Sequence, residues 1–393
     1  MKYNPFGGYE RQAALLAEAL AARGDRVTVF TGEWKGPWRP GITVEKVPVV
    51  RLASWLKVLS FAYFSRRRIL GARARFDVVV AFDRTLVADI YRAGNACHRE
   101  WEAFRSANEG LGGRLSMAIN PLGRVINGIE RRLFSTIARE RGRIVVLSET
   151  GMRQIRRHYD VDPDRFVVIP PAVDFSRFDD AGATASRAGV REELGAGVDT
   201  LVVLHVGSGF KIKGLRSTVE SMAVLKARGV DALLVVAGRD ARATARLRRL
   251  ADRLGIGGRV RFLGGVKDVA RLYSASDVFC VPSLFETFGV AAVEALYAGL
   301  PVIVGKGAGV ASAIEEWNAA GEAAGTVVDV PARADALADA IERTWKEEAR
   351  FRAHGGLEDR RRGRRALASR CGHDAVMEKF VSLIDETAGS GTN

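Results

Sequence analysis

Nine short runs rich in valine, isoleucine and leucine alternate with helix-like stretches along this chain, and this pattern constrains the fold most. Continuous apolar strands separated by helices are typical of parallel sheets that helices cover on both faces. The pattern therefore predicts an α/β fold. The runs span residues 26–30, 77–82, 143–147, 166–169, 200–206, 232–238, 259–264, 277–283 and 300–305.

The length of the chain predicts two domains. Its 393 residues, of which 47% are hydrophobic, are too many for one ordinary core. They suit two cores of roughly 150 to 200 residues each. Between residues 171 and 199 the periodicity is lost and alanine, glycine and aspartate become frequent, as in a linker followed by a short helix. We therefore place the boundary near residue 180 and expect doubly wound, Rossmann-like domains at 1–180 and 181–371.

The two ends of the chain are both assigned to the first domain. Residues 372–388 have apolar positions at helical spacing, and this helix is expected to complete the N-terminal domain. At the other end, Gly7 and Gly8 open a helix, but only six residues precede them. Because a doubly wound sheet places its central strand before such a loop, we expect that the first strand of this domain is missing from the chain.

The charge and the cysteines bear on partners and compartment. A net charge of +14 favours anionic partners, whether nucleic acid, acidic lipid headgroups or phosphorylated substrates. The basic run RRRGRR at 360–365 comes with no nucleic-acid recognition motif, so we expect a solvated helix face there and no nucleic-acid partner. The three cysteines, Cys97, Cys280 and Cys371, are far apart and odd in number, which indicates a reducing, cytoplasmic setting. No run of about 20 apolar residues suggests a membrane span.

The stretch SLFETFGVAAVEALYAGLPVI, 283–303, has two acids eight positions apart, Glu286 and Glu294. It predicts a loop that carries Glu286, followed by a helix from 289 to 298 that carries Glu294. The N–H groups near the helix start, those of Phe288, Gly289 and Val290, would suit a phosphate group. Carboxylates on either side of a phosphate pocket could hold the vicinal diols of two sugar rings, as in a sugar nucleotide. A solvated helix glutamate and a loop cap are the alternative.

Two glycine-containing loops before helices supply further candidates. In HVGSGFKIKGLRSTVESM, 205–222, a strand ends near Val206 and Lys211 and Lys213 precede a helix that begins near Gly214. Cations at that place could neutralise a diphosphate, and two surface lysines are the alternative. In NPFGGYERQ, 4–12, the glycine pair allows the backbone to approach a ligand closely.

These motifs together resemble a known family. Residues 262–303 resemble the donor-binding half of the retaining, two-domain glycosyltransferases of the family 4 type, whose E-x₇-E signature matches Glu286 and Glu294. The segments PFGGYER, ADIYRAGNACH, VIPPAVD and VGSGFKIKG are similar to the bacterial lipopolysaccharide-core glucosyltransferases that add glucose to heptose. The resemblance spans nearly the whole chain, more loosely between 99 and 140. It implies the GT-B fold, in which two Rossmann-like domains face each other across a cleft.

The resemblance also implies roles on the donor side. Glu286 would bind the donor sugar and Glu294 the ribose diol. Lys213, with Lys211 near it, would neutralise the diphosphate. Many relatives have an arginine at the position of Ser208, so the two lysines would carry most of the charge stabilisation here.

On the acceptor side the resemblance is less direct. Gly7 and Gly8 would face the diphosphate from the N-terminal domain. Relatives often carry an acid at the position of Asn95, and since an amide cannot act as a base, His98 or Asp89 could serve instead. A capping or packing role for His98 is the alternative.

The family implies retaining transfer without a metal or other cofactor, and no D-x-D pair or histidine spacing suggests a metal site. We expect a nucleotide-sugar donor, UDP-glucose by resemblance, and a saccharide acceptor that is lipid-linked or part of a lipopolysaccharide core. Residues 54–76 and 120–134 combine apolar and basic side chains, so they could dock a monomeric enzyme on an anionic membrane surface on the inner face of the cytoplasmic membrane. The alternative is that their apolar sides face the core.

Other functions fit the same fold. Sugar-nucleotide epimerases and phosphorylases share this architecture, and fold does not determine function. A non-catalytic sugar-nucleotide-binding scaffold is a third class, favoured if the first strand is truly absent. An oxidoreductase is a poorer fit, because GKGAG at 305–309 lacks the complete dinucleotide-binding fingerprint.

Overall fold

The computed structural model describes residues 8–34, 40–95, 97–140, 142–181 and 187–389, which form two compact units. The first unit comprises Met1–Ala172 with Asp374–Asn393, and the second comprises Val173–His373. The division lies before residue 180 because helix α7 (Ser176–Ala181) belongs with the second unit. Phe175, just before α7, stacks on Tyr297 of that unit with ring centroids 3.9 Å apart.

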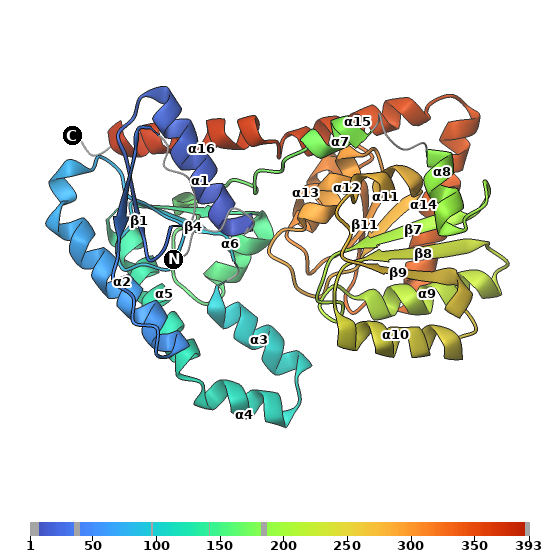
Figure 1. Ribbon diagram of the computed structural model, residues 1–393, viewed down its shortest axis with the longest axis horizontal. Coiled ribbons are helices and arrows are strands. Elements are labelled where there is room, and N and C mark those ends of the chain that lie inside the picture. Colours follow the sequence, from blue (N-terminus) through green and yellow to red (C-terminus); the bar gives the residue numbers. More distant parts are fainter. Residues whose placement is uncertain (1–7, 35–39, 96, 141, 182–186, 390–393) are drawn as a thin grey trace. The chain divides into compact units, whose positions relative to one another are not determined.

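The C-terminal unit is built on one six-stranded sheet whose strands are all parallel (Figure 1). The five apolar runs predicted in this half all form strands. The short segment GTVV, which the apolar-run criterion missed, adds an edge strand. The order across the sheet is β12 (Gly325–Val328), β11 (Val302–Gly305), β10 (Val278–Val281), β7 (Leu201–Val206), β8 (Ala232–Ala237) and β9 (Val260–Gly264).

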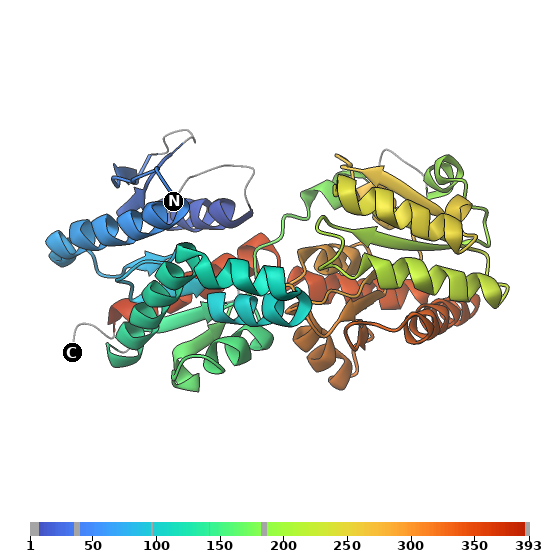
Figure 2. The ribbon, with the colours of Figure 1, turned by 90° about the horizontal axis from the view of Figure 1, so that it is seen from below.

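Helices cover both faces of this sheet, as the continuous apolar strands predict. Figure 2 shows α9 (Leu215–Ala227) and α10 (Ala241–Arg253) side by side along one face, and α14 (Ala334–Ala353) packs against α9. Their buried Leu215, Leu247 and Ile341 share one core with Leu234 and Ile303 of the sheet. Helices that contact the strands elsewhere in this unit are α11 (Ala270–Ala275), α12 (Val290–Tyr297) and α13 (Val310–Ala319), while α8 (Arg187–Leu194) packs on α11 and α15 (Leu357–Ser369) on α12.

The strand order places a topological switch point between β7 and β10. The chain leaves β7 towards β8 and β9 on one side, then returns to pair β10 with the other side of β7 and continues to β11 and β12. At such a point the loops after two adjacent strands diverge and leave a crevice at the carboxyl ends of the strands. The loops after β7 and β10 are those that carry Lys213 and Glu286.

The N-terminal unit contains two separate parallel sheets. One pairs β1 (Val27–Thr31) with β2 (Ile42–Lys46), and the other has the order β3 (Val80–Ala81), β4 (Ile90–Ala93), β5 (Arg143–Val146), β6 (Phe166–Val168). Among residues 8–34, 40–95, 97–140 and 142–172, no strand pairs with both sheets. The expectation of an additional central strand stays a prediction, and Gly7 lies outside the described residues.

The helices of the N-terminal unit include the C-terminal end of the chain. Helix α16 (His373–Gly389) buries Val376, Phe380 and Leu383 against Ile90 and Val145 of the four-stranded sheet. Short 3₁₀ turns occur in both units, at Arg73–Arg75, Pro163–Arg165 and Gly257–Arg259. The remaining helices of this unit are α1 (Gly8–Arg23), α2 (Ser54–Gly71), α3 (His98–Asn108), α4 (Leu111–Ile119), α5 (Pro121–Arg139) and α6 (Glu149–Arg156).

The basic run at 360–365 lies on α15, and part of it is buried rather than solvated. Arg364 is only 1% exposed and its guanidinium binds both carboxylate oxygens of Glu348. It also donates to the carbonyl oxygen of Gly299, just beyond the end of α12, while Arg365 donates to the carbonyl oxygen of Tyr297. Cations that bind the last carbonyls of a helix stabilise its C-terminus, so these arginines fix α12. The prediction of a solvated face was wrong for Arg364, because Glu348 supplies a buried counter-charge, while Arg362 and Arg365 are exposed.

Replacing Arg364 with alanine should strongly destabilise the C-terminal unit. The substitution removes the bidentate partner of the buried Glu348 carboxylate and leaves only Arg360, whose Nε lies 3.3 Å from Glu348 Oε1. Loss of one partner of a buried ion pair typically costs up to about 3 to 5 kcal/mol of stability. Urea unfolding measures this loss. The control is Arg362→Ala, because Arg362 pairs with Asp359 on the exposed side of the same helix and should change stability by no more than about 1 kcal/mol. Equal stability of the two variants would contradict a structural role for Arg364.

Candidate functional site

The loops after β7 and β10 are held together at the switch point by a glycine contact and a backbone hydrogen bond. Gly214, with a φ of 71°, adopts the left-handed conformation that favours glycine, and it precedes α9. A Cβ atom at this position would lie 2.2 Å from the carbonyl oxygen of Pro282. Leu284 N donates to the carbonyl oxygen of Ile212 over 2.7 Å. Only glycine lets the two loops approach this closely.

Lys213 and Glu286 form an ion pair between these two loops. Both side chains are 18% exposed, so the pair lies in a partly desolvated position that solvent can still reach. The lysine side chain lies against Gly207 at the end of β7, where a Cβ atom would come within 3.3 Å of Lys213 Cε. The structure therefore brings together two residues that the sequence motifs placed 73 positions apart.

Glu286 is held by three further contacts, one to its carboxylate and two to its backbone. Ser283 Oγ donates to Glu286 Oε2 over 3.0 Å. The Glu286 backbone donates to the carbonyl oxygen of Gly307 and accepts from Gly309 N, which links it to the loop after β11. Loops after three adjacent strands thus orient this one side chain, as expected of a ligand-binding group that must hold its position without a ligand.

Glu294 lies within α12 and is almost fully buried, with 8% of its surface exposed. One carboxylate oxygen forms an ion pair with Arg177 of α7, and the other accepts a 3.0 Å hydrogen bond from the hydroxyl of Tyr273. Burial raises the pKa of Glu294 above its usual value, while Arg177 and Tyr273 oppose that shift. The carboxylate is therefore paired on both oxygens. Sequence reasoning missed both partners, since Arg177 falls in the segment interpreted as a linker.

The start of α12 leaves several backbone donors unused. Helix α12 begins at Val290, close to the predicted start, and Gly289 has a φ of 113°. Within the described residues, the N–H groups of Phe288, Gly289 and Val290 donate to no acceptor. Such groups, aligned with the helix dipole, are well suited to bind an anion. They lie two to four residues after Glu286 in the chain.

His205 in β7 joins the two strands of the switch point but is not available for acid–base chemistry. Its Nδ1 lies 3.0 Å from the carbonyl oxygen of Cys280 in β10. Burial, together with the positive charge of Lys213, lowers the pKa of His205 to about 3. The imidazole is therefore neutral near pH 7 and its contact with β10 is structural.

The other predicted donor-side residues occupy more exposed positions. Lys211 is exposed on the loop after β7. Ser208 is exposed too, and its hydroxyl accepts a hydrogen bond from Arg239 N after β8. Gly8 is the first residue of α1 in the N-terminal unit, and Gly7 lies outside the described residues.

The acceptor-side candidates lie at the carboxyl end of β4 in the N-terminal unit. Asn95 is exposed just after the strand, and His98 begins α3. His98 Nε2 lies 3.2 Å from Glu102 Oε1, one turn further along α3, and burial lowers its pKa. Its backbone N–H donates to Glu130, a carboxylate that is 1% exposed and also binds Arg84. These contacts favour the packing interpretation of His98.

Asp89 lies at the opposite end of β4 from Asn95. Its carboxylate accepts hydrogen bonds from Arg73 and from Val79 N. The suggestion that Asp89 could serve as the base was wrong, because a residue before the strand cannot reach the edge at which Asn95 lies. The Asp89 carboxylate stabilises the turn that precedes β4.

Of the two segments proposed for membrane docking, 120–134 has its apolar side in the core. The apolar side of α5, including Ile126, Leu133 and Ile137, is buried. On α2, three large side chains remain between 41 and 52% exposed, namely Leu59, Tyr63 and Leu70.

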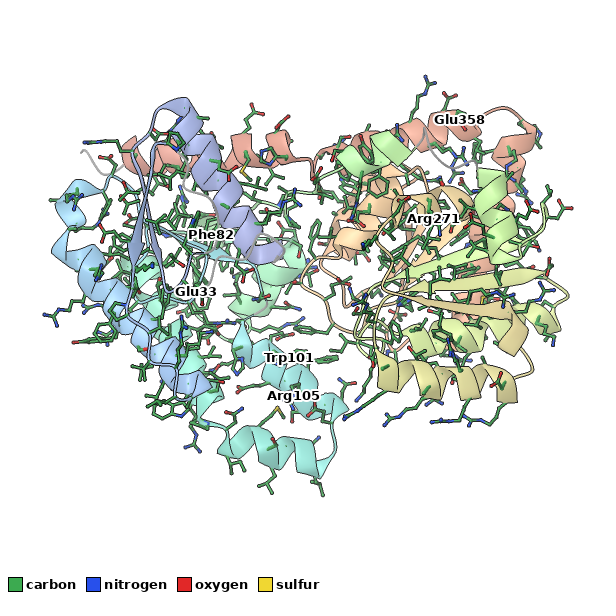
Figure 3. All side chains as sticks on the ribbon, in the orientation of Figure 1. Glu33, Phe82, Trp101, Arg105, Arg271 and Glu358 are labelled. Atoms are coloured by element: carbon green, nitrogen blue, oxygen red, sulfur yellow. The ribbon has the colours of Figure 1, made fainter. Side chains whose placement is uncertain are left out.

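Helix α3, between these segments, is held by contacts of its own. Figure 3 shows Trp101 and Arg105 on α3, where Trp101 stacks on Phe104 and Arg105 pairs with Glu109.

A more exposed apolar stripe lies on α4. Leu111, Leu115 and Ile119 are 83%, 65% and 73% exposed and follow each other at intervals of four residues. Residues at this spacing share one face of a helix.

Among the residues the structure describes, no helix is both long and apolar enough to cross a bilayer. Within the same residues, no group of three histidine, cysteine, aspartate or glutamate side chains could hold a metal ion.

Comparison with family models identifies both halves of the chain. Residues 187–361 match the model described as glycosyl transferases group 1, and residues 6–177 match the model described as glycosyltransferase family 4. Each match covers one of the two units almost completely. The resemblance inferred from the motifs is confirmed.

Individual relatives agree with these matches. The chain is 28% identical to the lipopolysaccharide glucosyltransferase WaaG of Escherichia coli K12 over 365 residues, or 90% of this chain and 92% of that protein. A D-inositol 3-phosphate glycosyltransferase of Corynebacterium glutamicum is 33% identical, but the alignment spans only half of either protein, with 53% of this chain and 50% of that one.

Solved structures show the same fold. The crystal structure of WaaG, described as a glycosyltransferase involved in lipopolysaccharide biosynthesis, matches with a TM-score of 0.69 and 26% identity over 100% of this chain and 98% of that one. Anabaena HepE, solved in complex with UDP and glucose, matches with a TM-score of 0.64 and 18% identity over 98% of this chain and 100% of that one. The predicted pair of Rossmann-like, GT-B domains is confirmed.

Proposed function

We propose a specific reaction for this chain, which belongs to the family 4 glycosyltransferases: transfer of a hexose from a nucleoside diphosphate sugar to a saccharide acceptor. UDP-glucose is the proposed donor, and a lipid-linked or lipopolysaccharide-core saccharide is the proposed acceptor. The similarity to WaaG supports this choice of acceptor, and the UDP and glucose bound by HepE support this choice of donor.

The observation that carries the proposal is the Lys213–Glu286 ion pair at the switch point between β7 and β10. A site for a sugar nucleotide needs a cation to bind the diphosphate and a hydrogen-bond acceptor to bind the hydroxyl groups of the sugar. The pair supplies both at the edge of the sheet where doubly wound folds bind ligands. When the donor binds, its phosphates would take over Lys213, and Glu286 would be freed to accept hydrogen bonds from the sugar.

The proposed chemistry is retaining transfer without a metal ion. As the bond between the sugar and the diphosphate breaks, negative charge develops on the departing phosphate. Lys213, Lys211 and the N–H groups at the start of α12 would stabilise that charge. Glu286 would hold the oxocarbenium-like sugar, and Glu294 would hold the ribose ring. The acceptor hydroxyl would enter on the face that the diphosphate leaves.

The acceptor side would contribute binding more than proton transfer. Asn95 carries an amide, which cannot accept a proton from the acceptor hydroxyl, but it can donate and accept hydrogen bonds to a saccharide. His98 would have to give up its contact with Glu102 to reach a substrate. We therefore assign Asn95 to acceptor binding and place the main catalytic effect in the C-terminal unit.

Replacing Lys213 with alanine should lower glucosyl transfer by about 10²-fold or more, because one preorganised charge-stabilising group is lost. Release of UDP from UDP-glucose in the presence of acceptor measures the effect. The matched control is Lys226→Ala on α9, whose ammonium group caps the carbonyl of Gly255 on the surface. Activity of the Lys213 variant near that of the control would contradict the assignment.

Chelation should leave the reaction nearly unchanged, since Lys213 and backbone N–H groups are proposed to perform the charge stabilisation that a divalent ion performs in other enzymes. Initial rates with and without EDTA should agree within about twofold, a difference too small to reflect loss of a catalytic ion. Loss of turnover in EDTA that manganese restores would contradict the proposed metal independence.

The exposed stripe on α4 supports a further part of the proposal, that a monomeric enzyme binds reversibly to the inner face of the cytoplasmic membrane. The stripe offers apolar side chains to the acyl region, and the net charge of +14 favours anionic headgroups. We propose α4, rather than the segments at 54–76 and 120–134, as the main contact. Helix α5 buries its apolar side, and the large apolar side chains on α2 are less exposed than those of the stripe on α4.

Sedimentation with phosphatidylglycerol-containing vesicles at low salt should recover the protein, and binding should weaken as salt screens the charges. Substituting Leu111, Leu115 and Ile119 with serine should weaken binding by about tenfold or more, because apolar area can no longer be buried. Val198→Ser, which changes an exposed valine in the other unit, should have no effect. Unchanged sedimentation of the triple variant would exclude α4 as the contact.

A further inference from the structure

We propose that Arg177 is a positioning residue for the donor: it holds the Glu294 carboxylate in the orientation in which its remaining lone pairs accept the two ribose hydroxyls. The inference deepens the proposed function and rests on it, because it assumes that Glu294 binds the ribose. It assigns a role in donor binding to α7, a segment that we interpreted as part of a linker from the sequence.

The geometry of the carboxylate carries the inference. Arg177 Nη2 binds Glu294 Oε1, and the Tyr273 hydroxyl binds Glu294 Oε2 over 3.0 Å. An ionised carboxylate offers about four acceptor positions, two on each oxygen. Each oxygen therefore has one position filled by the protein and one left over, which is the capacity that a vicinal diol requires. The two protein contacts also prevent the carboxylate from rotating.

Aromatic packing positions Arg177 beside Glu294. Phe175 stacks on Tyr297 with an interplanar angle of 3°, and Phe178 packs against Tyr273 with ring centroids 5.5 Å apart. Phe175 and Phe178 are both buried. Tyr297 lies three residues beyond Glu294 on the same helix, so the segment that carries Arg177 is fastened to the helix that carries the acid. The packing of these aromatic rings therefore fixes the contact between Arg177 and Glu294.

The charge balance around Glu294 gives Arg177 a second effect. Burial raises the pKa of Glu294, and Arg177 and Tyr273 counteract this. Of the charged and titratable groups on the neighbouring elements, Arg177 of α7 and Tyr273 of α11 bind the carboxylate, and Arg365 of α15 lies over the Tyr297 ring. Without Arg177 the carboxyl would stay protonated to higher pH. A protonated carboxyl loses acceptor capacity, so ribose binding would require a higher pH.

The opposite interpretation is that Arg177 blocks the acid and must leave before the donor binds. The two interpretations predict effects of opposite sign. If Arg177 positions Glu294, its removal weakens nucleotide binding; if it blocks Glu294, its removal strengthens binding. The half-exposed guanidinium, 46% accessible, lies on one oxygen only and leaves acceptor positions free, which favours positioning.

The test is calorimetric titration of the full chain with two probes, UDP and 2′,3′-dideoxyuridine 5′-diphosphate. Arg177→Met should weaken UDP binding by about tenfold or more, the usual effect of losing a hydrogen bond to a charged group. It should leave the dideoxy probe almost unaffected, because that probe has no ribose hydroxyls. The pH at which UDP binding reaches half its maximal affinity should move upward, and Arg177→Lys should restore most of the affinity at neutral pH.

Arg271→Met is the matched control, since Arg271 lies on α11 and pairs with Glu193, not with Glu294. It should leave the affinity for UDP unchanged. Melting temperatures confirm that each variant is folded, and Arg177→Gln, which keeps one donor without the charge, replaces the methionine variant if that variant melts far below the wild type. Unchanged or tighter UDP binding after removal of Arg177, or equal loss for both probes, would overturn the inference.

Failure of the inference can be told apart from failure of the proposed function. If the wild type binds UDP, and Glu294→Gln weakens binding while Arg177→Met does not, only the role of Arg177 is overturned. If the wild type binds neither UDP nor any other nucleoside diphosphate, the proposed function is overturned, and the role of Arg177 with it.

Discussion

The close approach of two loops at the switch point is the constraint on which the site depends. Strands β7 and β10 are neighbours in the sheet, and Gly214 lets the loops that follow them touch through the carbonyl of Pro282. With any side chain at 214 the loops would separate, and Lys213 would move away from Glu286. The ion pair is therefore a consequence of strand order combined with one glycine. The start of α12, with its free N–H groups, follows on the same loop as Glu286.

Both acids of the E-x₇-E signature have a cationic partner in the structure. Glu286 pairs with Lys213, which we propose to contact the diphosphate, and Glu294 pairs with Arg177 from α7. A partly or fully buried carboxylate without a partner would be destabilising or would take up a proton. Each acid thus has a counter-charge in the absence of a ligand. They differ in what a donor would do: the diphosphate would compete for Lys213, whereas Arg177 would stay in place.

The sequence predicted the C-terminal unit better than the N-terminal one, for physical reasons. Buried parallel strands are continuous apolar runs, and all five runs in that half are strands of the six-stranded sheet. Strand β4 has the sequence IYRA and β2 has the sequence ITVEK. Because both contain polar residues, a search for continuous apolar runs does not find them. At the site, Lys213 and Glu286 were predictable as candidates because they lie in loops between a strand and a helix, and Glu294 because the E-x₇-E spacing places it within the following helix. Arg177, Tyr273 and Ser283 were not, because their roles come from contacts between segments distant in sequence or from side-chain direction within a loop.

The central claim is that one sugar nucleotide spans Lys213, Glu286 and Glu294 in the C-terminal unit. A crystal structure of the protein with UDP-glucose tests this claim most directly. We predict diphosphate oxygens within hydrogen-bond distance of Lys213 Nζ and of the N–H groups that begin α12, ribose hydroxyls on the Glu294 carboxylate, and glucose hydroxyls on Glu286. A nucleotide bound elsewhere, with the Lys213–Glu286 pair intact and the Glu294 carboxylate untouched, would contradict it.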